Sequence, residues 1–285
     1  MDLDTIREVV VARERADLGV LGGSCAVLAG GTFLFSEPQE RLERLVDITA
    51  LGWPALTEVR DGLEIAATCT LAEFAGSVPG RELGAEVLRA DWPGTALFAR
   101  ACRALVASHK IWRSATVGGN VCLSLPAGAV LASLIALDGV ASVWTPGGSE
   151  RRIPLQKFVF GPGSNALNTG EVLRSITVPA RSLLSRTAFR KIALAPLGRS
   201  GAVVMGRREP DRRCALTVSA ATTKPVVLDY AQPPGTAEVL ASIDAIDPTL
   251  WFDDPHGAPD WRRHVAGRLA AQVAAELRVE AGEWQ

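Results

Sequence analysis

Short apolar runs that end at turn residues dominate the first part of the chain. Residues 25–28 and 45–48 are mostly apolar segments of strand length, bounded by polar residues or glycine. Two further strand-like runs flank Asp61 and Gly62, a dipeptide that favours a tight hairpin turn. The pattern therefore predicts two buried strands followed by a β-hairpin.

Apolar positions with helical spacing predict several helices. Ile6, Val9 and Val10 share one face of the opening segment. Thr70 and Glu73 have the spacing of a capping box, in which each residue bonds the backbone N–H of the other. The expected helices cover residues 5–18, a segment that begins at Thr70, residues 95–108, the apolar residues 126–138 and a segment that begins near Pro259.

The last of these helices is predicted to be amphipathic, so it should lie on a sheet rather than in a membrane. Apolar side chains recur on one face at every fourth residue, and charged or polar side chains occupy the other face. The apolar face carries Trp261, Val265, Leu269, Val273 and Leu277, and the polar face carries Arg262, Arg263, Arg268 and Gln272.

The central and C-terminal segments predict further strands. Residues 115–117 form a short apolar run that predicts a strand ending in a second glycine pair, and residues 146–148 separate two strand-like runs as a hairpin turn. A strand should also end at Pro179. Beyond Ala180 the chain becomes basic, and we place a domain boundary there. The later runs 188–194, 201–208 and 214–221 predict an antiparallel sheet.

The composition is that of a soluble, core-forming protein. Of its 285 residues 48% are hydrophobic and 21% are charged, and the formal net charge is -1, which argues against nucleic acid or anionic lipid as a partner. The acidic start lacks an export-signal pattern, which favours a cytoplasmic location. No apolar run approaches the roughly 20 residues that span a bilayer. The cysteines are scattered, which argues against a metal or iron–sulfur site in this chain.

Two apolar segments end in paired glycines, Gly30-Gly31 and Gly118-Gly119. Glycine lets a ligand approach the main chain closely, and successive N–H groups attract anions such as phosphate. The spacing fits neither a P-loop nor the G-x-G-x-x-G motif. Each pair taken alone could simply turn the chain, and this alternative stays open. Because the pattern occurs twice, we predict a phosphate site of a different type.

A series of motifs runs through the chain in a fixed order: AGGT, LVDI, DGLEIAAT, ATVGGN, LPAG, IALDG, RRIPL, GPG and GEVLRSITVP. This series resembles the FAD-binding subunit of the molybdenum hydroxylases, which include the medium subunit of aerobic carbon monoxide dehydrogenases and the flavin domain of xanthine dehydrogenases. The similarity covers nearly the whole chain. It implies an α+β fold of the vanillyl-alcohol oxidase type in residues 1–179, with two FAD-binding subdomains split near 55–60. Residues 180–285 would form a small α/β domain that resembles the carbon monoxide dehydrogenase flavoprotein C-terminal domain.

The resemblance also implies which residues hold FAD. Both glycine segments would grip the diphosphate, mainly through backbone N–H groups. Leu173 would pack on the flavin ring, and Lys191 would lie near the ring edge, where a cation could stabilise reduced flavin. An ordinary solvated lysine is the alternative for Lys191. The residues carried over are Ala29, Gly30, Gly31, Thr32, Phe33, Leu34, Thr116, Gly118, Gly119, Asn120, Pro126, Leu173 and Lys191.

Some positions depart from the family pattern. Phe33 stands where Asp or Ser is usual, and Ala129 stands where an Asp contacts the adenosine side. The run Trp112-Arg113 replaces Arg-Asn before the second glycine segment, and Trp112 could line the cofactor pocket. These changes predict weaker contacts to the adenosine end of FAD, whereas the glycines are intact.

By resemblance, the chain is an oxidoreductase subunit of a molybdenum hydroxylase. Substrate would be oxidised on a molybdopterin-binding large subunit, a [2Fe–2S] small subunit would relay electrons, and FAD in this chain would pass them to a final acceptor. The assembly would be a dimer of heterotrimers by analogy. Two alternatives stay open: a self-contained flavin oxidoreductase of related fold, which would need an acid–base cluster that the sequence does not offer, and a flavin-free structural subunit.

Overall fold

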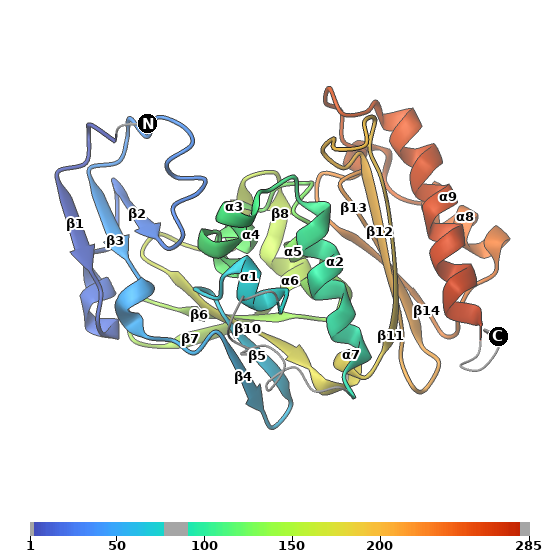
Figure 1. Ribbon diagram of the computed structural model, residues 1–285, viewed down its shortest axis with the longest axis horizontal. Coiled ribbons are helices and arrows are strands. Elements are labelled where there is room, and N and C mark those ends of the chain that lie inside the picture. Colours follow the sequence, from blue (N-terminus) through green and yellow to red (C-terminus); the bar gives the residue numbers. More distant parts are fainter. Residues whose placement is uncertain (1–2, 77–90, 280–285) are drawn as a thin grey trace.

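The computed structural model describes residues 3–76 and 91–279, and it contains three main sheets that follow one another along the chain (Figure 1). They have three, five and four strands. Helices lie between and outside the sheets. A small pair of strands, β8 (Val159–Gly161) and β9 (Ser164–Asn165), lies beside them.

The first sheet is parallel and has the order β1 (Glu8–Val11), β3 (Arg44–Asp47) and β2 (Cys25–Leu28). The two strands expected here are confirmed within one residue, but the predicted opening helix is wrong. Residues 9–11 are three successive valines, whose β-branched side chains favour extended backbone, and β3 offers them an edge to pair with. Between Leu3 and Ala55 the only helical segments are the short 3₁₀ helices η1 (Arg15–Val20) and η2 (Thr49–Leu51).

The second sheet is antiparallel, and its central strand is the longest. Both predicted hairpins, at residues 61–62 and 146–148, are confirmed. The central strand starts at Val172, at the side of the sheet that faces the first sheet. The strands, in their order across the sheet, are β4 (Leu56–Val59), β5 (Gly62–Ala66), β10 (Val172–Pro179), β6 (Val140–Trp144) and β7 (Glu150–Pro154).

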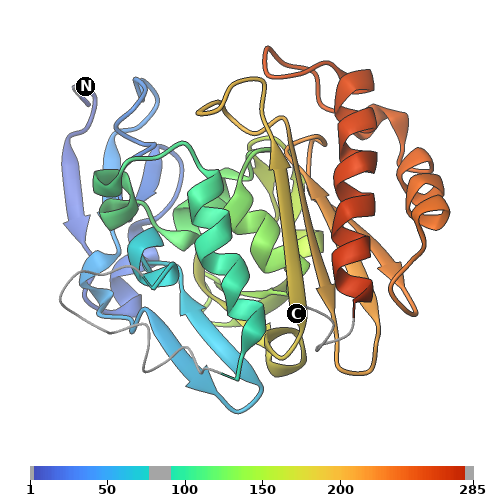
Figure 2. The same ribbon diagram turned by 45° about the vertical axis from the view of Figure 1, so that its right-hand side comes forward.

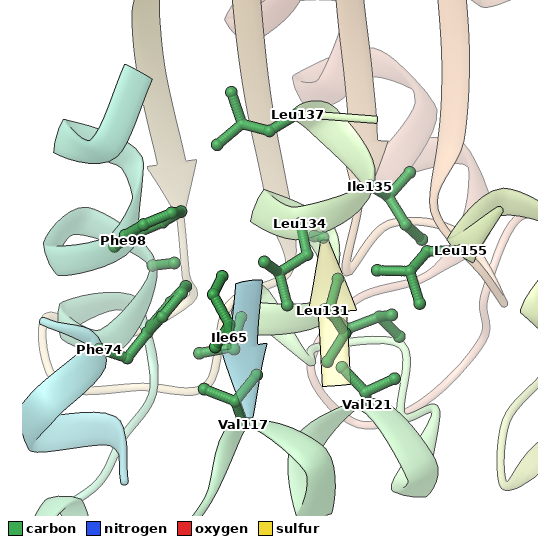
Figure 3. Packing of buried hydrophobic residues seen from close by; sticks show 14 of the residues in the cluster. Ile65, Phe74, Phe98, Val117, Val121, Leu131, Leu134, Ile135, Leu137 and Leu155 are labelled. Carbon is green, nitrogen blue, oxygen red and sulfur yellow. The ribbon is translucent and has the colours of Figure 1, made fainter. Parts of the chain in front are cut away.

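A layer of helices covers one face of the second sheet (Figure 1). Phe74 and Phe98 stack in its core with ring centroids 4.2 Å apart. Figure 3 shows how leucine and isoleucine side chains of α5 fill the space between the helices and the sheet. As predicted, α5 is buried along its whole length. The helices of the layer are α1 (Leu71–Phe74), α2 (Ala96–Ala104), α3 (His109–Ser114), α4 (Val117–Leu123), α5 (Ala129–Ala136) and α6 (Leu155–Phe158).

The third sheet is antiparallel, as predicted, and its fourth strand was not foreseen. Helices α8 (Thr236–Asp244) and α9 (Pro259–Arg278) cover one face, while α2 and α5 cover the other (Figures 1 and 2). The strands are β11 (Arg186–Ile192), β12 (Ala202–Arg208), β13 (Cys214–Ser219) and β14 (Val226–Tyr230). Short segments connect these elements: α7 (Ala180–Leu183), η3 (Pro93–Thr95) and η4 (Pro248–Leu250).

The apolar face predicted for α9 is confirmed, but Arg262 does not lie on the polar face. Its side chain is only 1% exposed. The guanidinium donates hydrogen bonds to the carbonyls of Gly201, Ala220 and Gly257 and pairs with the carboxylate of Asp254. Gly201 and Ala220 lie more than forty residues from Arg262 in the sequence, and Gly257 and Asp254 precede the helix, so helical periodicity could not reveal these partners. In the described part of the chain, no helix has both the length and the apolar character needed to cross a membrane.

Candidate functional site

A cleft of about 910 Å³ opens between the first sheet and the helix layer. Its volume is typical of small-molecule and cofactor sites, and most of its wall is apolar. Segments from distant places meet there, among them the end of β2, the chain before and after β3, the chain after β5, the α2–α3 connection, α4 with the turn that follows it, the start of β10, and the β11–β12 loop. All of the predicted cofactor-binding residues except Pro126 and Lys191 line this cleft.

The first glycine segment forms an irregular turn directly after β2. Gly31 adopts a φ of +66°, which glycine tolerates better than any other residue. Among the described residues, the backbone N–H groups from Gly30 to Leu34 have no hydrogen-bond partner. All of these residues line the cleft. Successive unpaired N–H groups of this kind can form a binding site for an anionic group.

The two glycine segments meet in space. A Cβ atom added to Gly30 would lie 1.8 Å from the carbonyl oxygen of Ser114 and 3.1 Å from the Cα of Ala115. Gly30 therefore packs directly against the backbone that leads into the second segment. The missing side chain lets the two segments come together, and both then face the same cleft.

The second glycine segment is helical, so the predicted strand ending in these glycines is wrong. Thr116 is the N-cap of α4, and Gly118 and Gly119 lie in the first turn of that helix. The hydroxyl of Thr116 accepts a hydrogen bond from the N–H of Gly119, and this capping favours helix over strand. A Cβ on Gly118 would lie 2.6 Å from the Cβ of Ala67, so this glycine allows α4 to pack closely on the chain after β5.

The donors of this helix turn are already in use. The N–H groups of Val117 and Gly118 bond the carbonyls of Cys69 and Ala67, and that of Gly119 bonds Thr116. Asn120 is also engaged, because its Oδ1 accepts from the N–H of Leu131 at 3.0 Å. The second segment thus shapes one wall of the cleft, whereas the first segment carries the unpaired donors.

Replacing Thr116 with alanine is expected to lower the free energy of unfolding by about 0.5–2 kcal/mol, because the N–H of Gly119 loses its cap. Thr116→Ser keeps the hydroxyl and serves as the matched control. Urea denaturation followed by circular dichroism measures the difference. Equal stability of Thr116→Ala and the unaltered protein would contradict a capping role.

The remaining predicted residues lie in different surroundings. Leu173, near the start of β10, is 3% exposed and contributes to the cleft wall. Pro126 is buried outside the cleft wall, and its carbonyl accepts hydrogen bonds from Ser219 and Ala220 in the third sheet. Lys191 is exposed on β11 and does not line the cleft. Trp112 is also absent from the cleft wall, although the neighbouring Ile111 is part of it.

Sequence reasoning missed two charged residues in the cleft wall, Glu171 and Arg199. The Glu171 carboxylate accepts hydrogen bonds from Arg151 and from the backbone and side chain of Asn168. Burial raises its pKa, but these hydrogen bonds outweigh the effect, so its pKa lies below the ordinary value and it stays ionised. Arg199 lies in the β11–β12 loop. No motif marks it, because its neighbours in space are distant in sequence.

The described residues offer no alternative metal centre. No group of three or more His, Cys, Asp or Glu side chains among them could hold a metal ion. The cleft-lining thiol of Cys122 has its pKa raised to about 12 by burial, so it is protonated near neutral pH. The cleft therefore remains the candidate functional site of the described part of the chain.

Comparison with known proteins supports this conclusion. The model of the FAD binding domain in molybdopterin dehydrogenase matches residues 4–181. Carbon monoxide dehydrogenase from Oligotropha carboxidovorans has a similar chain, with a TM-score of 0.80 and 19% identity over 99% of this chain and 100% of that one. The enzyme from Hydrogenophaga pseudoflava gives a TM-score of 0.77 at 20% identity, covering 95% of this chain and 97% of the other.

Quinoline 2-oxidoreductase from Pseudomonas putida 86 is also similar. Its chain gives a TM-score of 0.76 at 15% identity, and the match covers 97% of this chain and 98% of that one. At these identities the solved structures establish the fold of the chain, which is mixed helix and sheet. No curated protein sequence matches the chain significantly.

Proposed function

The chain belongs to the family of FAD-binding domains in molybdopterin dehydrogenases, and from this premise we propose that it binds FAD in the cleft and serves as the electron-transfer subunit of a molybdopterin-dependent hydroxylase. The supporting observation is the meeting of two glycine segments at one cleft, where successive backbone N–H groups lack partners. A diphosphate would supply acceptors for these donors.

The residues of the cleft fit the parts of FAD. The backbone from Gly30 to Leu34 would hold the diphosphate, because its unpaired N–H groups can donate to phosphate oxygens. The second glycine segment would support it by packing against Gly30. The apolar walls, with Leu173 among them, suit flat aromatic rings and exclude water. When bound, FAD would supply the redox chemistry, since flavin accepts electrons singly and can deliver them in pairs.

Phe33 gives the adenosine end an apolar character in this proposal. Its side chain is 39% exposed at the cleft, where relatives carry a polar residue by the resemblance described above. An aromatic ring can contact adenine by stacking but cannot accept hydrogen bonds as a carboxylate does. We expect Phe33 to replace polar contacts at this end with apolar ones.

The proposal extends to partners and domains. Electrons would come from a [2Fe–2S] subunit, which would receive them from a molybdopterin-binding subunit, and a final acceptor would take them from FAD. Residues 1–179 would form the FAD-binding domain, of the vanillyl-alcohol oxidase type and split near residues 55–60, and residues 180–285 would form the C-terminal flavoprotein domain. The first sheet gives way to the second between Asp47 and Leu56, and the second to the third between Pro179 and Arg186, which supports boundaries close to these points.

The absorbance spectrum of the purified full chain tests FAD binding directly. We expect the visible bands of oxidised flavin, or their appearance on adding FAD to protein that has lost it. Riboflavin, which lacks the diphosphate, is the matched probe and should bind much more weakly, because the unpaired N–H groups from Gly30 to Leu34 would have no phosphate to bind. Failure to bind FAD would overturn the proposal. If riboflavin bound as tightly as FAD, the proposed contact between the diphosphate and the Gly30–Leu34 backbone would be wrong.

A further inference from the structure

One positive charge stands in the apolar cleft. Among the described residues, Glu171 and Arg199 are the charged residues of the cleft wall. Glu171 is neutralised by Arg151, which bonds it through two guanidinium nitrogens. Arg199 has no partner of that kind, and its side chain remains 39% exposed. An anionic or electron-rich part of a ligand in the cleft would therefore find its cationic contact at Arg199.

A buried network sets the position of Arg199. Its Nη1 lies 3.5 Å from Oδ2 of Asp254, whose Oδ1 pairs with the buried Arg262. Arg262 also binds the carbonyl of Gly201, two residues after Arg199. These two guanidinium groups and the one carboxylate carry a net charge of +1, and the neighbouring carboxylate of Asp253 also acts on Arg262 by raising its pKa. Asp254 thus orients Arg199 without cancelling the positive charge of the cluster.

The position of Arg199 lies away from the first glycine segment. Arg262 bonds the carbonyls of both Gly201 and Ala220, and the N–H of Ala220 bonds Pro126 at 2.9 Å. Gly201, two residues after Arg199, therefore lies near the turn that follows α4. The first glycine segment packs at the opposite end of α4, and the seven residues of this helix rise by about 10 Å. If the diphosphate binds at Gly30, Arg199 would contact a different part of the ligand.

The neighbouring residue provides a second indication of a ligand. Ser200 also lines the cleft and is 4% exposed, and its hydroxyl has no hydrogen-bond partner among the described residues. Buried hydroxyls are rarely left without a partner. A polar ring edge held against this wall would give Ser200 a partner and would face the guanidinium of Arg199.

We propose that Arg199 contacts the polar edge of the flavin ring, that Ser200 adds a hydrogen bond there, and that Asp254 is the positioning residue for Arg199. The inference rests on the proposed binding of FAD. It assigns to Arg199 the role that sequence reasoning gave to Lys191, which is exposed on β11 outside the cleft. A cation at this edge favours the reduced, negatively charged ring over the oxidised, neutral one.

Two measurements on the full chain test the proposal: the flavin midpoint potential and the dissociation constants of FAD and of ADP, which lacks the ring. Arg199→Gln should lower the midpoint potential and weaken FAD binding about threefold to tenfold, the effect of losing one half-exposed charged hydrogen bond. ADP affinity should not change. Arg199→Lys should retain most of the potential. Asp254→Asn removes a negative charge together with the anchor of Arg199, and these act on the potential in opposite directions, so its positioning role is measured by FAD binding, which should weaken less than in Arg199→Gln.

Lys191→Gln is the matched control, because it removes the same charge from the same hairpin outside the cleft and should leave the potential unchanged. An unchanged potential in Arg199→Gln would overturn the inference while FAD binding by the unaltered protein stands. A parallel loss of ADP affinity would overturn it in favour of a diphosphate contact. If the unaltered protein binds no FAD, the proposed function fails first, and the assignment of Arg199 fails with it.

Discussion

Replacing Gly30 with alanine is expected to weaken FAD binding about 100-fold, equivalent to about 2.7 kcal/mol, and to lower the free energy of unfolding by about 2–3 kcal/mol. The added Cβ would lie 1.8 Å from the carbonyl oxygen of Ser114 and 2.6 Å from its carbonyl carbon. Both atoms belong to the backbone that leads into α4, so no side-chain rotation relieves the contact. The two glycine segments would have to separate, and the unpaired N–H groups would move with them.

Fluorescence titration with FAD and urea denaturation of the same preparations would measure both effects. Gly147→Ala is the matched control, because an added Cβ there meets no atom within 4 Å and the residue lies in the β6–β7 hairpin turn. It should leave FAD binding unchanged. If Gly30→Ala bound FAD as tightly as the unaltered protein, contact between the two segments could not be needed for the cofactor.

Replacing Arg262 with leucine is expected to destabilise the protein by about 3–5 kcal/mol, the cost of breaking a buried ion pair from one side. The change leaves the carbonyls of Gly201, Ala220 and Gly257 without their donor and Asp254 without its closest cation. Burial lowers the pKa of Arg262, but Asp254 opposes that shift and favours the charged form. An apolar replacement therefore removes several bonds at once without satisfying their partners.

Arg263→Leu, one position further along α9, provides the control. Arg263 pairs with Asp244 at 2.8 Å, but both side chains are exposed, so its loss should cost about 0–1 kcal/mol. Calorimetric unfolding of both variants would give the comparison. Similar melting temperatures for Arg262→Leu and Arg263→Leu would show that the buried bonds of Arg262 add nothing to stability.

Most strands were predictable from sequence because their signals are local. Turn residues such as Asp61-Gly62 fix a hairpin over a few positions, and the capping box at Thr70 and Glu73 forms as expected. The helix predicted for the opening segment was wrong. Ile6, Val9 and Val10 have helical spacing, but the segment forms a strand that pairs with β3, about 36 residues away. Pairing over such a distance overrides a weak periodic signal.

The candidate site shows the same limit. The first glycine segment could be predicted, since a strand followed by Gly-Gly needs only local pattern recognition. Whether its backbone N–H groups are hydrogen-bonded could not be predicted, because that depends on which carbonyl groups lie nearby in the folded chain. In the second segment those carbonyls belong to Ala67 and Cys69, and they occupy the N–H groups that we expected to hold phosphate. Arg199 could not be predicted as a site residue, because Asp254, which pairs with it, and Arg262, which pairs with Asp254, follow more than fifty residues later in the sequence.

Helix α5 belongs to two structural units at once. It packs on the second sheet on one side and against β12 and β13 on the other, and Val203, Met205 and Ala220 complete the same apolar core. A fragment that stopped near residue 181, where the family match ends, would leave that side of α5 in water. The sheet of the C-terminal part therefore contributes to the core around α5, and we expect the two parts to unfold in a single cooperative transition.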